Sequence, residues 1–462
     1  MFKRELDKAE LIVYVMIATY AAFFIYYTFS KHYAFMTYMF DLGVYNHNFW
    51  MLLNYGDPKF PFGAIHLFLT IYAINPTPET LLTIQALIIP LGALFIYKLA
   101  RYQLSDRKIA LLLAGIYLLY PPLHGISQFD FHLEAFLPTL FLAAAYFYSI
   151  QKWRIYTVTL CFILITMRPA AYLAFFLGLY FLIGNMRDTR IGLKSLKVSL
   201  ASKLGVKYAI VTLIASGVVI SVHNLVTPET VSYADTLSAS DLRERIEYFS
   251  KIYGPLSFVP FLSPSHLIPA LPWITFVLVT PNLSREHLML YNQYPAYITP
   301  FVCLGAISAL RRLEPHRKKV IMLLLATTML YLATVDPVLS NPYPPVTPRW
   351  PDITLRDQAL TEIIQLIPPQ VSVLTQNNIA PHLTNRKEIY ISLFNSSIQP
   401  DYVLVDTSHF SYDEPNFKPA PAQILPRLIE SGRYGLKARC NEILLYQKGY
   451  KGETWKPPSC QS

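Results

Sequence analysis

Long apolar runs separated by short polar segments fill the first two-thirds of the chain, and most of them approach the length that crosses a bilayer as a helix. A shorter run at residues 65–74 cannot cross and is expected to dip into the membrane or lie at its interface. Because proline disfavours helix in the residue before it, Arg168-Pro169 predicts two short helices within residues 155–183. The predicted membrane segments are residues 11–29, 80–99, 109–120, 133–150, 155–183, 208–222, 294–310 and 320–335.

The pattern changes after the proline-rich segment 341–351, which marks a domain boundary. Beyond it, short apolar runs alternate with helical patterns, as in a soluble α/β unit. We therefore predict a membrane domain at 1–340 and a small α/β domain at 341–462. The expected elements of the second domain are a helix at 355–367, strands at 371–374, 389–391 and 402–405, a helix at 422–430 and a hairpin at 436–447.

Basic residues decide the orientation, because Lys and Arg concentrate in cytoplasmic loops. The first run follows Lys3, Arg4 and Lys8 and has no clear cleavage site, so the amino terminus is predicted to be cytoplasmic. The basic loop 185–207 is then cytoplasmic, while the first loop 31–78, the segment 223–294 and the carboxyl-terminal domain are extracytoplasmic. Residues 266–280 are treated as re-entrant, since a full crossing would put the basic cluster around Arg311 outside.

Composition agrees with a multi-pass protein of the cell membrane. Of 462 residues, 53% are hydrophobic and only 15% are charged, which excludes an ordinary soluble globule. The formal charge of +10 lies mostly in the loops, so it indicates topology and not nucleic-acid binding. No glycine-rich phosphate loop is present. Cys440 and Cys460 share the outer domain and can form a disulfide in an oxidising compartment.

The candidate chemistry begins in residues 40–50, a polar and aromatic stretch that contains Asp41. Ionisable residues at a membrane edge are costly to keep, so their default interpretation is functional. Asp41 is the candidate catalytic acid or base. Further ionisable and aromatic residues also fall at the predicted outer ends of spans, where they can face one cavity. The candidates for substrate binding are His47, His66, Arg168, Arg285, His287 and Tyr291.

Asp130, His132 and Glu134 are candidates for a divalent cation, because carboxylate oxygens with an imidazole suit magnesium or manganese. The alternative is that Asp130 and Glu134 cap the next helix, where carboxylates favour the helix dipole. His66 can instead be a polar residue at the membrane interface that does not bind substrate. Arg168 can instead extend to headgroup phosphates.

Several stretches resemble a prokaryotic membrane family filed as domain of unknown function two thousand and seventy-nine. They are FDLGVYNHNFW, HLFLTIYAINPTPETLLTIQALIIPLGALFIYKLA, FDFHLEAFLP, IPPQVSVLTQNNIAPHLTNRKEIY and DYVLVDT. That family is similar in architecture to the GT-C glycosyltransferases, which carry a catalytic acid in the first outer loop and end in an outer soluble domain. The resemblance implies a polytopic α-helical GT-C-like fold with an extracytoplasmic α/β domain. It also implies that Asp41 is the catalytic acid or base.

The resemblance further implies transfer of a sugar from a polyprenyl-phosphate donor in the lipid bilayer to an extracytoplasmic acceptor. Two positions depart from the family pattern. Asn46 and His47 stand where members usually have an acid and a glutamine, and Met167-Arg168-Pro169 replaces an often acidic apex. The rival interpretation is a non-enzymatic protein, either a transporter of lipid-linked material or a scaffold with a partner-binding outer domain. A transporter is expected to show repeated halves, and the sequence shows no such repeat.

Overall fold

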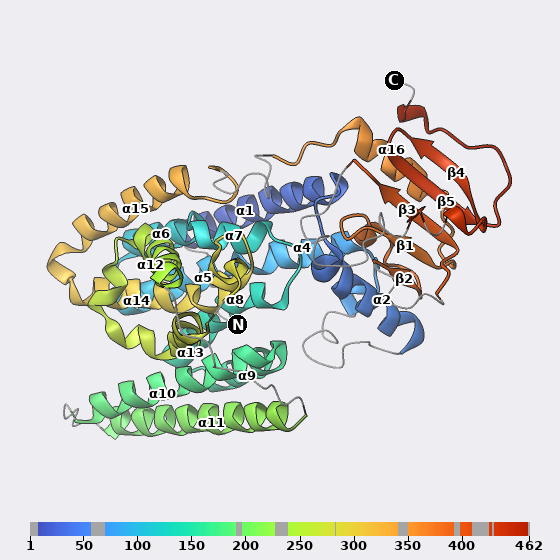
Figure 1. Cartoon of the computed structure of the whole chain (residues 1–462). Helices are drawn as coiled ribbons and strands as arrows, with labels where there is room; N and C mark the ends of the chain where they lie inside the picture. Colours follow the sequence, from blue (N-terminus) through green and yellow to red (C-terminus); the bar gives the residue numbers. More distant parts are fainter. Residues whose placement is uncertain are drawn as a thin grey trace.

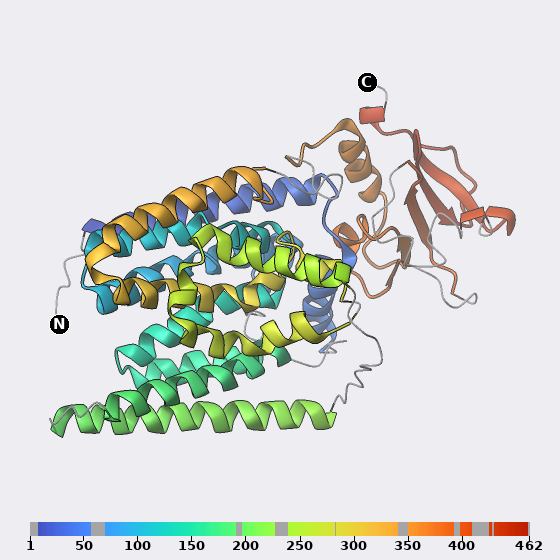
Figure 2. The ribbon, with the colours of Figure 1, turned by 60° about the vertical axis from the view of Figure 1, so that its left-hand side comes forward.

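The computed structural model describes residues 8–56, 70–190, 196–226, 239–281, 283–340, 350–391, 398–408, 425–426 and 429–460. Most of it is a bundle of helices, and the carboxyl-terminal domain lies at one end of that bundle (Figure 1). After a 60° turn the helices are seen to run roughly parallel, with the start of α1 at the end away from that domain (Figure 2). The predicted division into a helical domain and an α/β domain is therefore visible in the arrangement of the elements.

The first helix, α1, spans Lys8–Tyr33, and a five-residue π-helix at Met39–Gly43 leads into α2, Val44–Tyr55. Predicted segment 80–99 forms two helices, α4 and α5, interrupted at Ile89 and Pro90, where proline removes a backbone donor. α4 spans Pro78–Ile88 and α5 spans Leu91–Leu104. The helices that follow to the end of the bundle are α6 Arg107–Leu118, α7 Pro121–Gln128, α8 Leu137–Ser149, α9 Trp153–Thr166, α10 Arg168–Arg190, α11 Leu196–Val226, α12 Ala239–Tyr253, α13 Leu267–Val279, α14 Thr299–Arg312 and α15 Arg317–Thr334.

Two sequence expectations for the bundle were wrong. The sequence analysis predicted no helix between segments 109–120 and 133–150, yet residues 121–128 form α7, whose side chains are all buried. Its polar residues have tertiary partners: His124 donates to Asp336 at 2.7 Å, and Gln128 donates to the carbonyl of Tyr291 at 2.6 Å. The basic loop 185–207 is largely helical, because α10 continues to residue 190 and α11 begins at residue 196. By contrast, the predicted break before Pro169 is present at Met167, between α9 and α10.

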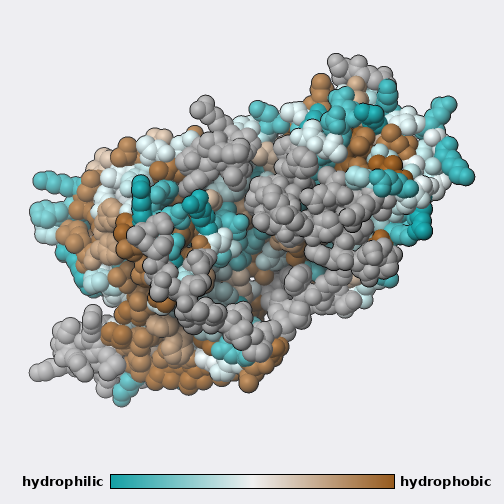
Figure 3. Space-filling view, viewed as in Figure 1, coloured by the Kyte–Doolittle hydropathy of each residue, from teal (hydrophilic) through white to brown (hydrophobic). Residues whose placement is uncertain are grey.

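Among the described residues, three helices are long and apolar enough to cross a membrane, namely 8–33, 78–104 and 203–226. A fourth span results if α6 and α7, bent by 47°, count as one. The other predicted segments form helices, but shorter ones, including the expected re-entrant segment at α13. The face shown in Figure 3 is hydrophobic over the lower part of the bundle, where α10 and α11 lie, and more hydrophilic over the carboxyl-terminal domain.

The carboxyl-terminal domain contains one helix, α16 (Leu355–Ile364), and a five-stranded sheet in the order β2-β1-β3-β5-β4. The strands are β1 Val373–Thr375, β2 Ile389–Tyr390, β3 Tyr402–Asp406, β4 Tyr434–Cys440 and β5 Ile443–Lys448. The first three pair in parallel, while β5 is antiparallel to both β3 and β4, which confirms the predicted terminal hairpin. Of the helix predicted at 422–430, the structure describes residues 425–426 and 429–430, which are helical, and the others lie outside the described residues.

The two domains share a tightly packed interface at the segment between α1 and α2. Phe35 has a left-handed backbone, φ 55°, and its side chain is 1% exposed within the hydrophobic core of the carboxyl-terminal domain, beside Leu360 and Leu404. Next to it, the rings of His32 and His382 stack with centroids 4.0 Å apart, and His382 Nε2 donates to the carbonyl of His32 at 3.0 Å. The interface is therefore both apolar and hydrogen-bonded.

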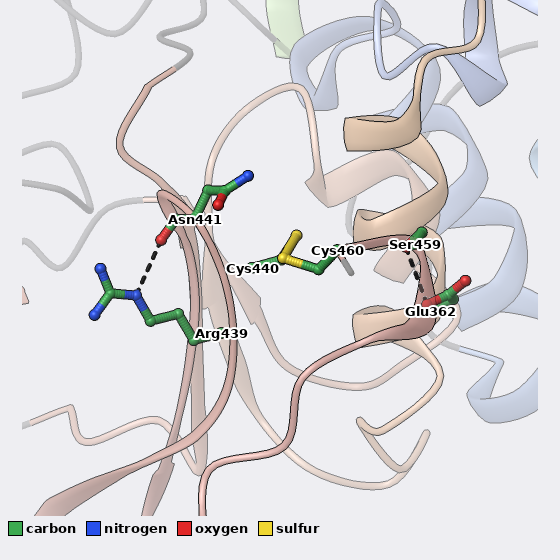
Figure 4. The surroundings of a disulfide bond; sticks show 6 residues. All are labelled: Glu362, Arg439, Cys440, Asn441, Ser459 and Cys460. Atoms are coloured by element: carbon green, nitrogen blue, oxygen red, sulfur yellow. Dashed lines mark hydrogen bonds between the residues drawn. A yellow bond between two sulfur atoms is a disulfide. The ribbon is translucent and has the colours of Figure 1, made fainter. Parts of the chain in front are cut away.

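Cys440 and Cys460 form a disulfide that ties the end of β4 to the carboxyl terminus, beside α16 (Figure 4). Ser459 donates to Glu362 of that helix at 3.1 Å. The bridge closes a loop with a sequence separation of 20 residues, which stabilises a domain by about 3 kcal/mol in the chain-entropy account. The disulfide that the sequence allowed is thus present in the structure.

We expect Cys460→Ser to lower the stability of the carboxyl-terminal domain by about 3 kcal/mol, because the unfolded chain regains the freedom of that loop. Chemical denaturation followed by the fluorescence of Trp455 measures this loss. Cys161→Ser is the matched control, since Cys161 is an exposed free cysteine on α9. Equal stability of the two variants would contradict the expected role of the bridge.

We expect acid to weaken the domain interface at His382. Burial lowers the pKa of His382 well below its ordinary value, and the stacked His32 ring acts in the same direction, against the weaker opposing charge of Glu79. The folded protein therefore keeps the ring neutral, while the unfolded chain protonates near pH 6.5. Stability should fall below that pH by about 1.4 kcal/mol per pH unit for this group.

Thermal unfolding of the full-length protein at pH 7 and pH 5 measures the effect. His382→Gln keeps a donor for the carbonyl of His32 and should reduce the difference between the two pH values. His316→Gln is the control, because His316 is exposed at the opposite end of the bundle. An equal pH dependence in wild type and His382→Gln would refute the assignment.

Candidate functional site

Asp41 lies in the π-helix between α1 and α2, at the end of the bundle that meets the carboxyl-terminal domain. Its side chain is 16% exposed, more than the groups around it. Oδ1 accepts a hydrogen bond from Nε2 of His132 at 3.1 Å, and Oδ2 has no hydrogen-bond partner among the described residues. One carboxylate oxygen is therefore fixed while the other is available to a ligand.

The π-helix is held on both sides by the loop after β1 of the carboxyl-terminal domain. Before Asp41, the backbone N–H of Met39 donates to the carbonyl of Asn377 at 2.9 Å and to its side-chain oxygen at 2.8 Å. After Asp41, Asn46 donates to the Thr384 hydroxyl at 2.7 Å, and Nδ1 of His47 donates to the Thr384 carbonyl at 3.0 Å. The position of Asp41 thus depends on the second domain.

His132 is positioned by the loop between α7 and α8. Its backbone N–H donates to Gln85 of α4 at 2.8 Å, and Nδ1 faces the carbonyl of Asp130 at 3.1 Å. Both ring nitrogens therefore face oxygens that can accept, the carbonyl of Asp130 and the carboxylate of Asp41, and an imidazole donates to both only when it is doubly protonated. Burial alone lowers the pKa of His132, but the hydrogen bond and charge of Asp41, with the charge of Glu134, outweigh it and raise the pKa to about 9.

Glu134 is the second carboxylate near His132, and it is 7% exposed. Its Oε1 accepts from the Tyr297 hydroxyl at 3.3 Å, whereas its Oε2 is buried without a partner among the described residues. The Tyr45 ring lies 5.6 Å from the His132 ring, in an edge-on arrangement. We refer to Asp41, Tyr45, His132, Glu134 and Tyr297 as the Asp41 cluster. Buried polar atoms without partners are uncommon, so the orphan oxygen of Glu134 marks a place for a ligand group or water.

Asp130 belongs to a neighbouring ion pair instead. Lys31, from the last turn of α1, lies 2.8 Å from Oδ1 of Asp130, and the backbone N–H of Tyr38 donates to Oδ2 at 2.7 Å. Both side chains are at most 3% exposed. The Lys31 ammonium also lies 5.4 Å from the Phe129 ring and 5.7 Å from the Tyr291 ring. This pair ties α1 to the 129–132 loop, so its role is structural.

The predicted cation site at Asp130, His132 and Glu134 does not fit the donor geometry. Both Asp130 oxygens already accept from Lys31 and from the Tyr38 backbone, and both ring nitrogens of His132 face acceptor oxygens. Among the residues that the structure describes, no group of three His, Cys, Asp or Glu side chains is arranged to hold a metal ion. Magnesium or manganese dependence stays a prediction, without assigned ligands.

The remaining candidates for substrate binding do not join the Asp41 cluster. His47 is 6% exposed and contacts the carboxyl-terminal domain, and Tyr291 packs its ring beside Lys31. Arg168 starts α10 and donates to Asn224 at 2.6 Å, while its neighbour Met167 contacts the Tyr297 hydroxyl. Arg285 is 78% exposed and pairs with Glu244.

His287 stacks on Tyr294, with ring centroids 4.1 Å apart. His66 lies outside the described residues. The sequence interpretation therefore grouped His132 and Glu134 with Asp41 correctly in space but gave them the wrong partners. It missed Lys31, Gln85 and Tyr297, although Lys31 and Gln85 are polar residues inside apolar helices, which is a usable signal.

The comparisons with known proteins agree with this architecture. No curated protein sequence matches the chain. The structure of ArnT from Cupriavidus metallidurans in the apo state matches with a TM-score of 0.52 at 12% identity, over 95% of this chain and 98% of that chain. ArnT from the same organism bound to undecaprenyl phosphate matches with a TM-score of 0.51 at 14% identity, over 94% and 97%. At this identity the likeness shows only that the chain shares its fold with ArnT. The family described as "Predicted membrane protein (DUF2079)" matches residues 62–445, more than half of the sequence, and the chain therefore belongs to that family of membrane proteins.

Proposed function

We propose that this protein is a membrane glycosyltransferase that transfers a sugar from a polyprenyl-phosphate donor to an acceptor hydroxyl, with Asp41 as the general base. The observation that carries the proposal is the pairing of Asp41 with the His132 imidazolium, which leaves the second carboxylate oxygen available at the rim of a buried cluster. The GT-C-like fold supports the reaction class, and the undecaprenyl phosphate bound by ArnT supports the kind of donor.

The reaction needs one proton acceptor and one stabilised leaving group. Oδ2 of Asp41 takes the proton of the acceptor hydroxyl while its oxygen attacks the anomeric carbon. The bond between that carbon and the phosphate oxygen breaks, and the polyprenyl phosphate leaves with the electron pair. His132 keeps its proton throughout and holds Oδ1 in place, so the base has one orientation.

Cations must stabilise the charge that develops on the leaving phosphate. Arg168 is the proposed cation, because it follows Met167, which contacts the Tyr297 hydroxyl of the Asp41 cluster. The orphan Oε2 of Glu134 is the proposed acceptor for a hydroxyl of the sugar.

The proposed orientation puts the Asp41 end outside the cytoplasm and the amino terminus inside. Basic residues gather at the amino-terminal end of the bundle, where Lys98 pairs with Glu10 and Arg317 donates to the carbonyl of Leu104. Positive charge at that end favours the cytoplasmic side. The disulfide between Cys440 and Cys460 supports an oxidising, extracytoplasmic location for the other end.

We expect Asp41→Asn to reduce transfer by about 10²–10⁴-fold, the usual contribution of a general base. The assay first identifies co-purified polyprenyl-linked sugars by mass spectrometry and then follows their consumption by the full-length protein. Glu314→Gln is the control, because Glu314 is exposed at the other end of the bundle. Equal turnover in wild type and Asp41→Asn would remove Asp41 from catalysis and favour a transporter or scaffold.

We expect transfer to decline as the pH rises through about 9, because the His132 imidazolium, whose pKa is raised to about 9, then loses its proton. Below that pH the His132 imidazolium keeps its charge, so this group contributes an alkaline limb to the profile. A pH–rate profile measures this limb. In His132→Gln, which cannot titrate, the rate should be lower overall and the alkaline limb absent. An unchanged alkaline limb in that variant would assign it to another group.

A further inference from the structure

A second polar cavity lies at the end of the bundle opposite Asp41. It has a volume of about 470 Å³ and lies between the carboxyl-terminal ends of α5, α8 and α14 and the facing parts of α10 and α11. Its walls carry hydroxyl, amide and aromatic groups, and none of the described residues that line it is acidic. The cavity therefore presents donors and positive charge without a competing carboxylate.

Arg311 is the charged residue in the lining, and it is exposed. Its guanidinium has no hydrogen bond or ion pair among the residues that the structure describes. Its neighbours are engaged: Arg312 donates to the carbonyl of Leu262 at 2.7 Å, and Arg317 donates to the carbonyl of Leu310 at 2.9 Å. Arg311 is thus the local arginine whose five donors remain available.

Neutral donors lie beside it. Ser308, one helical turn before Arg311 on α14, faces the Tyr180 hydroxyl, which also lies within range of the Arg311 charge. Both residues line the cavity. A planar guanidinium with adjacent hydroxyls matches the oxygens of a phosphate group, which arginine can bind through two parallel hydrogen bonds.

The opposite wall is rigid and aromatic. Tyr148 stacks on Phe181 with ring centroids 3.7 Å apart, accepts from Asn185 at 2.6 Å and donates to the carbonyl of Gly205 at 2.7 Å. The Trp153 ring stacks on the Tyr208 ring, with centroids 4.6 Å apart. Trp and Tyr favour the depth of lipid headgroups, so the cavity has the surroundings of a headgroup site.

We propose that this cavity binds the phosphate of an anionic phospholipid, with Arg311 as its cation and Ser308 and Tyr180 as neutral partners. The basic end of a membrane bundle attracts anionic lipids, and pockets between helices on that side take up their headgroups. The site lies at the opposite end of the bundle from the Asp41 cluster and does not depend on the proposed transferase activity.

Native mass spectrometry of the full-length protein, titrated with phosphatidylglycerol or phosphatidylcholine, tests the proposal. We expect wild type to retain phosphatidylglycerol preferentially and Arg311→Gln to retain it about ten- to hundredfold more weakly, the usual effect of removing a charge-assisted hydrogen bond. Lys318→Gln is the matched control, because Lys318 is exposed on α15 outside the lining and loses the same charge. Ser149→Leu, which narrows the cavity without a change of charge, should also weaken retention.

Three outcomes would overturn the proposal. Equal weakening by Lys318→Gln and Arg311→Gln would indicate diffuse attraction and no defined site. Equal retention of the two lipids by wild type would exclude recognition of the headgroup charge. Thermal stabilisation of wild type by inorganic phosphate to the same extent as by phosphatidylglycerol would assign the cavity to free phosphate. Asp41→Asn should retain phosphatidylglycerol like wild type, so failure of this site is distinguishable from failure of the proposed transfer reaction.

Discussion

The contact between the loop after β1 and the segment that carries Asp41 determines the geometry of the whole site. Asn377 binds the backbone before Asp41, and Thr384 binds Asn46 and His47 after it. A π-helix is rare and often occurs at functional positions, and here it is supported from both sides by another domain. Without that support, the short segment between α1 and α2 would have no fixed orientation.

This contact also explains the two residues that depart from the family pattern. Asn46 and His47 are buried and bind the carboxyl-terminal domain, so they do not replace an acidic ligand in the site. Asn46 also accepts from the Tyr72 hydroxyl at 2.8 Å, which links the same position to the helical domain. These contacts attach the segment that carries Asp41 to the carboxyl-terminal domain.

Two ion pairs lie side by side at this end of the bundle and serve different purposes. Lys31 and Asp130 are fully buried, and replacing one partner would leave an uncompensated charge that costs about 3–5 kcal/mol. Asp41 and His132 are partly accessible, and one oxygen of Asp41 keeps no partner among the described residues. Exposure, more than charge, separates the structural pair from the candidate catalytic pair.

The sequence predicted the helices and strands well because hydrophobic period and proline positions act locally. It also predicted that Asp41, His132 and Glu134 could face one cavity, since all three fall at the predicted outer ends of spans. It could not predict α7 as a helix, because the polar residues His124 and Gln128 are buried only through partners far along the chain. For the same reason the sequence analysis assigned Asp130 to a metal site. The Lys31 ammonium, which binds the Asp130 carboxylate instead, is 99 residues away in sequence.

Phe35 gives the proline-rich boundary at 341–351 a different meaning. The aromatic ring that completes the hydrophobic interior of the last domain is supplied by the first loop of the chain, more than 300 residues earlier. A fragment that begins after the boundary would fold, if at all, around an unfilled hollow. The boundary between the two domains in the sequence therefore differs from the boundary between their hydrophobic cores.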